Sequence, residues 1–422
     1  MTRTQHIRAR IVWPVDQPPV DDGALVVADG TIREVGRVRA VASPAGAERV
    51  DLGDAILLPG LVNAHCHLDY THMAGQIAPT SAFTDWIKCI TALKGSWPAA
   101  AFRDSWLAGA AMSVRRGATT VADIEAVPEL LPDVWRETPL RVISFLEMTG
   151  VKSRRNPGAI LGESLAKADA LPTGRCGVGL SPHAPYSTVP ELLRLSAEAA
   201  RARGWRLATH VAESAEEYEM FMEARGTMYD WLARNERDMA DCGGVSPVQH
   251  LAQHGVLGPN FLAVHANVLQ PGDAELLAGS GSAVVHCPRS HAYFGHRPFA
   301  RLGLERAGVN VCLGTDSLTT VLKRHEQVLD LFCEMREFMA SSPGVAPAAV
   351  VGLATVNGAR ALGLDGRAGT LAVGAWADAI AVPFAGAITE TADAVVHHAG
   401  DVAASMIGGE WALAPASGRI PA

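Results

Sequence analysis

Residues 59–69 read PGLVNAHCHLD, a short apolar run that ends in two histidines separated by one residue. An apolar run of this length predicts a buried β-strand over residues 58–67. Side chains alternate between the two faces of a strand, so His65 and His67 are expected to point to the same side. The stretch therefore predicts a strand whose carboxyl end carries a pair of imidazoles on one face.

Beyond this strand, apolar strand candidates alternate with helical stretches along the chain. The eight strand candidates are residues 58–67, 118–124, 141–148, 177–182, 206–211, 261–268, 282–287 and 309–314. Helices are predicted between them, among them residues 99–116, 189–203 and 325–340. Eight such units predict an α/β protein built on a (β/α)8 TIM barrel, whose active site lies at the carboxyl ends of the strands.

The two ends of the chain lack this alternation. Short strand candidates fill residues 7–56, and the Asp29-Gly30 turn between two of them is a strong hairpin signal. Short strands are predicted again in residues 369–383 and 402–411. We expect the two ends to pack together as one small β-sandwich beside the barrel. The predicted segments are residues 1–56 and 365–422 for the two parts of the sandwich and residues 57–364 for the barrel.

Side chains that can bind a metal gather at the predicted strand ends. They are His65, His67, His183, His210, Glu213, His265, His286 and Asp316. A single histidine is more often a surface or core residue than a ligand, but this joint placement is hard to obtain by chance. Imidazole and carboxylate groups hold divalent transition metals and leave a position open for water. The pattern predicts one divalent metal ion that makes hydroxide available at neutral pH, with Glu213 placed to shuttle a proton.

Six motifs together resemble the amidohydrolase superfamily. They are PGLVNAHCHLD (59–69), SPHAP (181–185), HVAE (210–213), VHA (264–266), HCPRS (286–290) and GTDS (314–317). The resemblance also includes ADGTIREVG (28–36) and GTLAVGAWADAIAV (369–382), so it covers nearly the whole chain. The most similar branch is that of the cytosine deaminase and chlorohydrolase-like enzymes. It includes adenosylhomocysteine/methylthioadenosine, aminodeoxyfutalosine and guanine deaminases, and triazine hydrolases.

The resemblance implies a role for each matching residue. The metal ligands of the family correspond to His65, His67, His210 and Asp316. Glu213 matches the carboxylate that moves a proton from the attacking water to a ring nitrogen, and His265 matches the histidine that orients or activates this water alongside Asp316. The fourth strand ends in His183 and lacks the lysine that bridges two metals in binuclear members. This implies a single metal ion and a substrate contact by His183. Zinc is the favoured metal, with iron and manganese as alternatives.

The loop after the seventh strand departs from the family pattern. The family often has CPxSN there, whereas this chain has CPRSH (287–291). Arg289 and His291 are therefore candidates for substrate contact, and the alternative is that they brace the loop.

Two further residues are candidates for substrate contact. Trp86 either stacks on a planar base or anchors a helix in the core. Glu147 either binds a ribose hydroxyl or pairs with Arg154 or Arg155.

Composition argues against several classes of protein. The chain has 36 Lys and Arg against 44 Asp and Glu, a net charge of −8, which disfavours a nucleic-acid partner. No apolar run is long enough for a signal-peptide core or a membrane span, so no membrane partner is expected. The seven cysteines are odd in number and contain no CxxC. We therefore expect a cytoplasmic protein without a disulfide framework. A homodimer is the default oligomer.

These features predict an enzyme, a hydrolytic deaminase acting on carbon–nitrogen bonds other than peptide bonds. The expected substrate is a small amino-substituted heterocycle, most simply a purine-like nucleoside or base of the adenosylhomocysteine/methylthioadenosine or aminodeoxyfutalosine type. A triazine chlorohydrolase or amine hydrolase is the alternative within hydrolases. Glu213 favours the deaminase, because protonating a ring nitrogen helps most when the leaving group is poor. A catalytically silent binding barrel is the alternative of another class, and the complete ligand and acid–base set argues against it.

Overall fold

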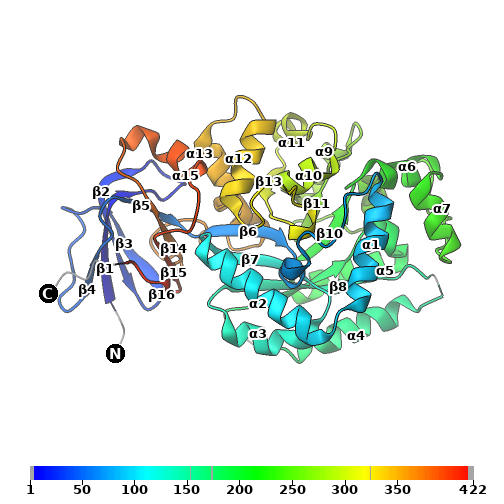
Figure 1. The fold of residues 1–422 in the computed structure, drawn as a ribbon, viewed down its shortest axis with the longest axis horizontal. Coiled ribbons are helices and arrows are strands. Elements are labelled where there is room, and N and C mark those ends of the chain that lie inside the picture. The colour runs from blue at the N-terminus through cyan, green and yellow to red at the C-terminus, as the bar shows by residue number, and fades with distance from the viewer. Residues whose placement is uncertain (1–3, 153, 173, 324, 417–422) are drawn as a thin grey trace.

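Two eight-stranded sheets organise the chain in the computed structural model, which describes residues 4–152, 154–172, 174–323 and 325–416. One sheet is a parallel barrel with helices around it, and the other sheet lies beside it, on the left of Figure 1. The barrel strands follow one another in chain order: β6 (Leu61–Cys66), β7 (Ala118–Glu125), β8 (Arg141–Met148), β9 (Gly177–Pro182), β10 (Leu207–Val211), β11 (Phe261–His265), β12 (Ala283–His286) and β13 (Asn310–Leu313). These strands are almost wholly buried, which explains why they read as continuous apolar runs.

Helices connect the barrel strands and cover their outer side. They are α1 (Phe83–Ser96), α2 (Ala99–Arg115), α3 (Leu131–Glu137), α4 (Pro157–Asp169), α5 (Pro190–Arg203), α6 (Ala215–Glu223), α7 (Thr227–Arg234), α8 (Pro247–Gln253), α9 (Asp273–Ser280), α10 (Pro288–Phe294), α11 (Arg301–Ala307), α12 (Leu331–Ser341), α13 (Pro347–Leu353) and α14 (Val356–Ala361). Local sequence sets their ends. For example, α5 begins with Pro190 in its first turn and ends at Gly204, whose φ of 66° suits glycine.

The barrel closes where its first strand, β6, meets its last, β13. The contact is an isolated parallel bridge between Cys66 and Asp316, in which the Asp316 N–H donates to the carbonyl of His65 at 3.1 Å. The Asn63 side chain strengthens it: its Nδ2 donates to Thr315 Oγ1 at 2.8 Å, and its Oδ1 accepts from the Thr315 N–H at 3.0 Å. We call this junction the seam. It brings Asp316 between the two histidines that flank Cys66.

The two ends of the chain form the second sheet together. Its strands are β1 (Thr4–Val12), β2 (Val20–Ala28), β3 (Thr31–Arg37), β4 (Glu48–Asp51), β5 (Ala55–Pro59), β14 (Ala379–Pro383), β15 (Ala404–Ile407) and β16 (Glu410–Leu413). The pairing order is β16-β15-β14-β5-β1-β2-β3, with β4 also paired to β1, so hydrogen bonds join all eight strands into one continuous sheet. The short helix α15 (Thr391–Val396) lies between β14 and β15 in the chain. An apolar cluster that includes Ile56 and Ile380 of the sheet and Phe332 of α12 holds the sheet against the barrel.

The α/β class, the barrel and the β-structure shared by the two ends are as the sequence predicts, with local differences. The last part of the N-terminal strand region forms two short strands, β4 and β5, separated by a turn at Gly53. The helix expected from residue 325 begins at Leu331, because the Asp330 side chain caps it by accepting from the Phe332 N–H at 2.7 Å. Residues 1–3 and 417–422 of the expected terminal segments lie outside the described residues. In the part of the chain that the structure describes, no helix is long and apolar enough to cross a membrane.

Candidate active site

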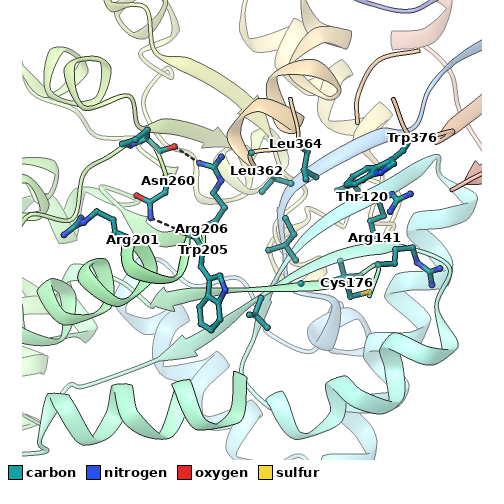
Figure 2. Close-up of a pocket in the computed structure, with 18 residues that line it drawn as sticks. Thr120, Arg141, Cys176, Arg201, Trp205, Arg206, Asn260, Leu362, Leu364 and Trp376 are labelled. Atoms are coloured by element: carbon teal, nitrogen blue, oxygen red, sulfur yellow. Dashed lines mark hydrogen bonds between the residues drawn. The ribbon is translucent and has the colours of Figure 1, made fainter. Parts of the chain in front are cut away.

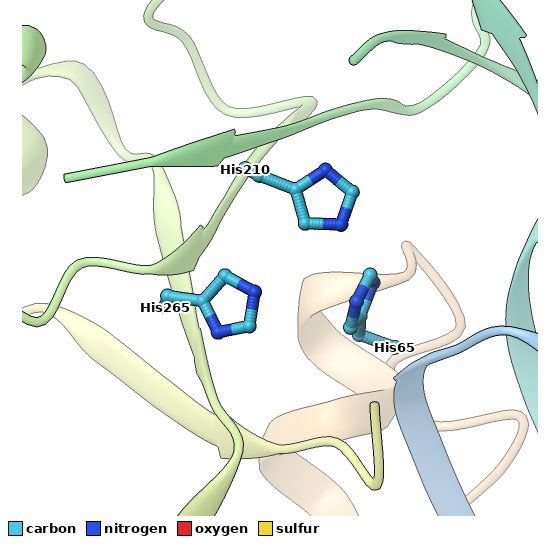
Figure 3. A group of neighbouring side chains, drawn as sticks. All are labelled: His65, His210 and His265. Atoms are coloured by element: carbon cyan, nitrogen blue, oxygen red, sulfur yellow. The ribbon is translucent and has the colours of Figure 1, made fainter. Parts of the chain in front are cut away.

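Four histidines and one aspartate converge at the carboxyl end of the barrel. His65 and His67 come from the end of β6, and the seam places Asp316 beside both, with its Oδ1 3.6 Å from each Nε2. His210 and His265 come from the neighbouring strands β10 and β11, whose register pairs His210 with Val264. The imidazoles of His65, His210 and His265 face a common centre (Figure 3). Ligand atoms within 4.8 Å of one another form two groups that share His65: His65, His210 and His265, and His65, His67 and Asp316.

The protonation states of this cluster suit a divalent cation. His210 Nδ1 lies 2.8 Å from the carbonyl oxygen of His183, which can only accept, so Nδ1 carries the proton and Nε2 presents its lone pair. The Nε2 atoms of His65 and His265 are buried without a hydrogen-bond partner among the described residues. Burial lowers the pKa of His67 and of His265 to about 3, so both imidazoles are neutral at pH 7. Unpaired neutral imidazole nitrogens buried around a carboxylate are the donor set that zinc, iron or manganese accepts.

Asp316 supplies the negative charge of the cluster. Burial alone would raise the pKa of Asp316, but the neighbouring His65, His265 and His67 imidazoles outweigh that effect. The pKa of Asp316 therefore lies well below its ordinary value, and the carboxylate is ionised. An ionised ligand among neutral imidazoles stabilises a bound cation.

Glu213 lies at the edge of this cluster with its Oε1 3.5 Å from Nε2 of His265. Its backbone is held on both sides: the N–H donates to Glu217 Oε2 at 2.8 Å, and the carbonyl accepts from Asn267 Nδ2 at 3.0 Å. Burial raises the pKa of Glu213 well above its ordinary value, and the charges of Asp316 and Glu217 add to the effect. The raised pKa brings the carboxyl group closer to neutral pH, where it can both accept and donate a proton.

A cavity of about 450 Å³ opens onto the cluster. Of the residues that the sequence predicts for substrate contact, Trp86, Glu147 and His183 line it. Sequence reasoning missed other lining residues, among them Tyr70, Ile87, Ile90, Lys94, Tyr186, Trp231, Leu232 and Asn235. Most of these are aromatic or aliphatic, so the cavity has apolar walls and a polar end, which is the usual composition of a small-molecule site.

A buried ion pair lies in the cavity wall between α1 and β8. Lys94 Nζ is 3.1 Å from Glu147 Oε2, and His183 Nε2 is 3.9 Å from Glu147 Oε1. Burial alone would raise the pKa of Glu147, but Lys94, His183 and His67 outweigh it and lower that pKa to about 2. The sequence offered Arg154 or Arg155 as the ion-pair partner of Glu147, and this alternative is wrong. Glu147 pairs with Lys94, whereas Arg154 pairs with Glu236 at 3.2 Å.

Arg289 and His291 do not line the cavity among the described residues. The Arg289 guanidinium is buried and bonded to Glu334 of α12, with Nε 2.5 Å from Oε1. His291 Nδ1 lies 3.0 Å from Asn267 Oδ1, and Asn267 Nδ2 donates to the Glu213 carbonyl. His291 therefore orients the Asn267 side chain. Both placements match the bracing alternative. His286 is also outside the cavity, stacked on Phe299 with ring centroids 3.8 Å apart.

The backbone around the cluster is strained. Ala212, His265, Ala266 and Asp316 all have positive φ, between 49° and 73°. Such conformations cost about 1 to 3 kcal/mol each for residues other than glycine, and they cluster at functional sites. Each follows or ends a barrel strand, so the sharp bends turn side chains into the mouth of the barrel.

A parallel barrel with buried histidines and a carboxylate at its carboxyl end is typical of metal-dependent hydrolases. Comparison with known proteins identifies the family. The model of the amidohydrolase family matches residues 56–412. The chain therefore belongs to the amidohydrolase family.

Individual relatives cover most of the chain. A 5-methylthioadenosine/S-adenosylhomocysteine deaminase from Syntrophobacter fumaroxidans is 32% identical over 387 residues, which cover 86% of this chain and 80% of that protein. A 5'-deoxyadenosine deaminase from Methanothermobacter thermautotrophicus is 31% identical over 385 residues, covering 87% and 82%. The crystal structure of an adenosine deaminase from Xanthomonas campestris, with bound zinc, has a TM-score of 0.81 at 24% identity and covers 96% of this chain and 92% of that one.

Proposed function

We propose that this amidohydrolase is a hydrolytic deaminase that replaces the amino group of a purine-like nucleoside or base with a carbonyl oxygen. One observation carries the proposal: a set of imidazole and carboxylate groups that can hold a metal lies beside Glu213, whose pKa is raised by burial, at the polar end of one cavity. The two relatives named as deaminases of adenine nucleosides support the same reaction and substrate class.

The proposed ligands are His65, His67, His210 and Asp316, and they hold one divalent metal ion. Zinc is the favoured ion, because imidazole and carboxylate ligands suit it and the Xanthomonas campestris relative contains it. Iron and manganese accept the same ligands. When bound, the metal lowers the pKa of a water molecule toward neutrality and so supplies hydroxide.

The residues of this chain then move the protons. His265 and the ionised Asp316 orient the attacking water, and Glu213 takes a proton from it. Glu213 then donates this proton to the ring nitrogen beside the carbon that carries the amino group. A further proton from water reaches the amino group, which leaves as ammonia, so one water is consumed and a carbonyl remains. Glu213 acts as acid and base in one cycle, which its raised pKa supports.

The cavity walls favour a planar substrate. Trp86, Tyr186 and Trp231 line the cavity and offer aromatic surfaces on which a heterocycle can stack. Glu147 and His183 lie at the polar end and are proposed to bind hydroxyl groups of a sugar. Arg289 and His291 are proposed to support the site from outside.

Metal analysis and an ammonia-release screen on the purified protein test the proposal. The panel contains adenosine, 5-methylthioadenosine, S-adenosylhomocysteine, 5'-deoxyadenosine, aminodeoxyfutalosine, guanine, cytosine, and chlorinated and alkylamino triazines. We expect about one metal ion per chain and ammonia from adenine nucleosides. Release of chloride or alkylamine with no ammonia would overturn the deaminase in favour of a triazine hydrolase. A protein with neither metal nor turnover would indicate a silent barrel.

A pair of histidine variants controls this experiment. His65→Ala removes a buried proposed ligand, and we expect it to lose both metal and activity. His397→Ala changes an exposed histidine outside the site and should keep both. Equal metal content and turnover in the two variants would contradict the proposed centre.

A further inference from the structure

A second cavity, of about 600 Å³, lies at the opposite end of the barrel from the metal ligands. It is lined by residues at or just before the starts of four barrel strands: Arg141 at β8, Gly177 at β9, Arg206 before β10 and Asn260 before β11. Leu362 and Leu364 after α14, and Trp376 before β14, complete its wall (Figure 2). It shares no lining residue with the cavity of the proposed active site among the described residues. A ligand here would not compete with substrate for space.

The lining of this cavity carries a surplus of positive charge. Four arginines line it, and no acidic residue does within the described ranges. Arg141 alone is neutralised, by Asp378 at 2.6 Å. The other three are Arg175, Arg201 and Arg206, and no carboxylate lies within ion-pair distance of them in the described part of the chain.

These three arginines are held in place by backbone carbonyl groups. Arg175 donates to the carbonyls of Leu140 and Thr138 at 3.0 and 2.7 Å, Arg201 to Gly255 at 2.8 Å, and Arg206 to Pro259 at 2.5 Å. Each guanidinium has five N–H groups, so most remain for another acceptor. Burial lowers the pKa of Arg206, as expected for a cation that no negative group compensates.

The rest of the lining is apolar and partly aromatic. Val142, Ile143, Leu362 and Leu364 line the cavity, and Trp205 and Trp376 add two indole rings. Guanidinium groups already lie over both indoles: Arg141 and Arg367 are 3.9 and 5.3 Å from the Trp376 ring centroid, and Arg203 is 4.8 Å from that of Trp205. Apolar surface next to fixed guanidinium groups suits a molecule with an anionic end and a planar body.

We propose that this cavity is a second binding site, separate from the active site, for a small organic anion that carries a carboxylate or a phosphate on a planar apolar body. Arg206 binds the anionic group, and the more exposed Arg175 and Arg201 add positive charge to the lining. The apolar wall from Leu362 to Leu364, together with Trp205, holds the body.

Isothermal titration calorimetry on the full-length, metal-loaded protein tests the site with three probes. Phenyl phosphate and benzoate each combine a ring with an anion, and benzyl alcohol is the uncharged counterpart. We expect at least one of the two anions to bind, with affinity that falls as salt is raised, and benzyl alcohol to bind more weakly than that anion. Binding of phenyl phosphate alone assigns a phosphate ligand, and binding of benzoate alone assigns a carboxylate. If benzyl alcohol binds as well as the anions, or if neither anion binds, the proposal is overturned.

Three variants locate the binding. Arg206→Gln removes one uncompensated cation, and we expect it to weaken the anion about tenfold. Gly177→Leu places a side chain in the cavity and leaves every arginine in place. A Cβ atom at this position would have no other atom within 4 Å, so the larger residue fits. It should weaken the anion at least as much. Arg306→Gln removes an exposed arginine outside the cavity, so it matches the charge change and should bind as the wild type does.

Thermal unfolding of each variant shows whether it folds. If Arg206→Gln is unfolded, Gly177→Leu decides. Unchanged binding in a folded Gly177→Leu would place the anion elsewhere and overturn the site.

Discussion

Glu213 is held more firmly than a surface carboxylate would be. Its N–H and its carbonyl are both hydrogen-bonded, and the residue before it, Ala212, has a φ of 50°. His291 supports this arrangement through Asn267. The backbone at Glu213 is therefore fixed, which limits the positions that its carboxyl group must search before a proton transfer.

Replacing Glu213 by glutamine should separate proton transfer from metal binding. Glu213→Gln keeps the size of the side chain but loses the titrating proton, so we expect turnover to fall about 10²- to 10⁴-fold with metal content unchanged. Ammonia release and metal analysis measure the two quantities. Glu223→Gln, an exposed change at the end of α6, is the matched control. Loss of metal in Glu213→Gln would show that Glu213 is a ligand.

The Lys94 and Glu147 pair predicts an acid-dependent loss of stability. The pKa of Glu147 falls from an ordinary 4.5 to about 2 in the folded protein. A lowered pKa stabilises the fold above about pH 4.5, and this stabilisation is lost as the pH falls toward 2. We expect the double variant Lys94→Met/Glu147→Gln to lose less unfolding free energy between pH 5 and pH 2.5 than the wild type, by up to about 3 kcal/mol. Urea unfolding followed by tryptophan fluorescence measures it.

An exposed pair on the same helix provides the control. Lys88 and Asp85 are 2.8 Å apart on α1, but their side chains are 45% and 53% exposed. Lys88→Met/Asp85→Asn should leave the pH dependence as in the wild type. If both double variants behave alike, the buried pair does not contribute.

The sequence could locate some of these residues but not their partners. The strand-end histidines, Glu213 and Asp316 were predictable because strand periodicity and barrel geometry place them together. Lys94 was not, because it lies on a helix 53 residues before Glu147 in the chain. The position of a residue in a helix predicts the side of the helix on which it lies. The pairing of Lys94 with Glu147 depends in addition on how α1 packs over the barrel mouth.

At the scale of elements, the short helix α10 is fastened to α12 by one buried arginine. Arg289 donates from its backbone N–H and its Nε to Glu334, and from Nη2 to the carbonyl of Val328 at 2.7 Å. Burial raises the pKa of Glu334 to about 7 even with Arg289 beside it. The two helices and the loop before α12 are thus joined through a single guanidinium.

Replacing Arg289 by methionine should test bracing against substrate contact. Arg289→Met leaves Glu334 buried without its partner, so we expect a loss of about 3 to 5 kcal/mol in unfolding free energy. KM should stay close to the wild-type value in the folded protein. Arg301→Met breaks a pair with Glu305, whose side chain is 49% exposed, and should cost less than about 1 kcal/mol. A raised KM at unchanged stability would instead place Arg289 against substrate.

The ends of an element were predictable from the sequence where burial of apolar residues sets them. They were not predictable where a capping side chain sets them. The strands β8 and β9 agree with the apolar runs at both ends. Helix α12 begins six residues later than its apolar pattern suggested, because the side chain of Asp330 satisfies its first N–H groups. The strand expected to reach residue 268 ends at His265, where the backbone changes to positive φ. Periodicity does not report such a reversal.

At the scale of the molecule, the two ends of the chain depend on each other. Strand β5 lies between β1 and β14, so each end supplies a hydrogen-bonding neighbour for the other. A chain that stops at Asp378 lacks β14 to β16 and exposes the edge of β5 with its apolar face. We expect this truncation to give aggregated protein, judged by soluble yield and circular dichroism. A chain that stops at Leu413 keeps every described strand and should fold; equal solubility of the two would show that the barrel needs no terminal sheet.

Removal of the metal should weaken the junction between β6 and β13. The proposed ligands His65 and His67 lie on one side of the seam and Asp316 on the other, and the backbone there offers a single bridge. We expect a chelator to lower the unfolding temperature and to speed amide hydrogen exchange in β6 and β13 more than in β8 and β9. Uniform exchange across the barrel after chelation would contradict this.

The proposed cation would therefore have a structural role as well as a catalytic one. The ion would join the first barrel strand to the last, because its proposed ligands come from both ends of the barrel sheet. Activity and closure of the barrel would then be lost together, so molecules whose barrel is open between β6 and β13 should accumulate only after the metal is removed.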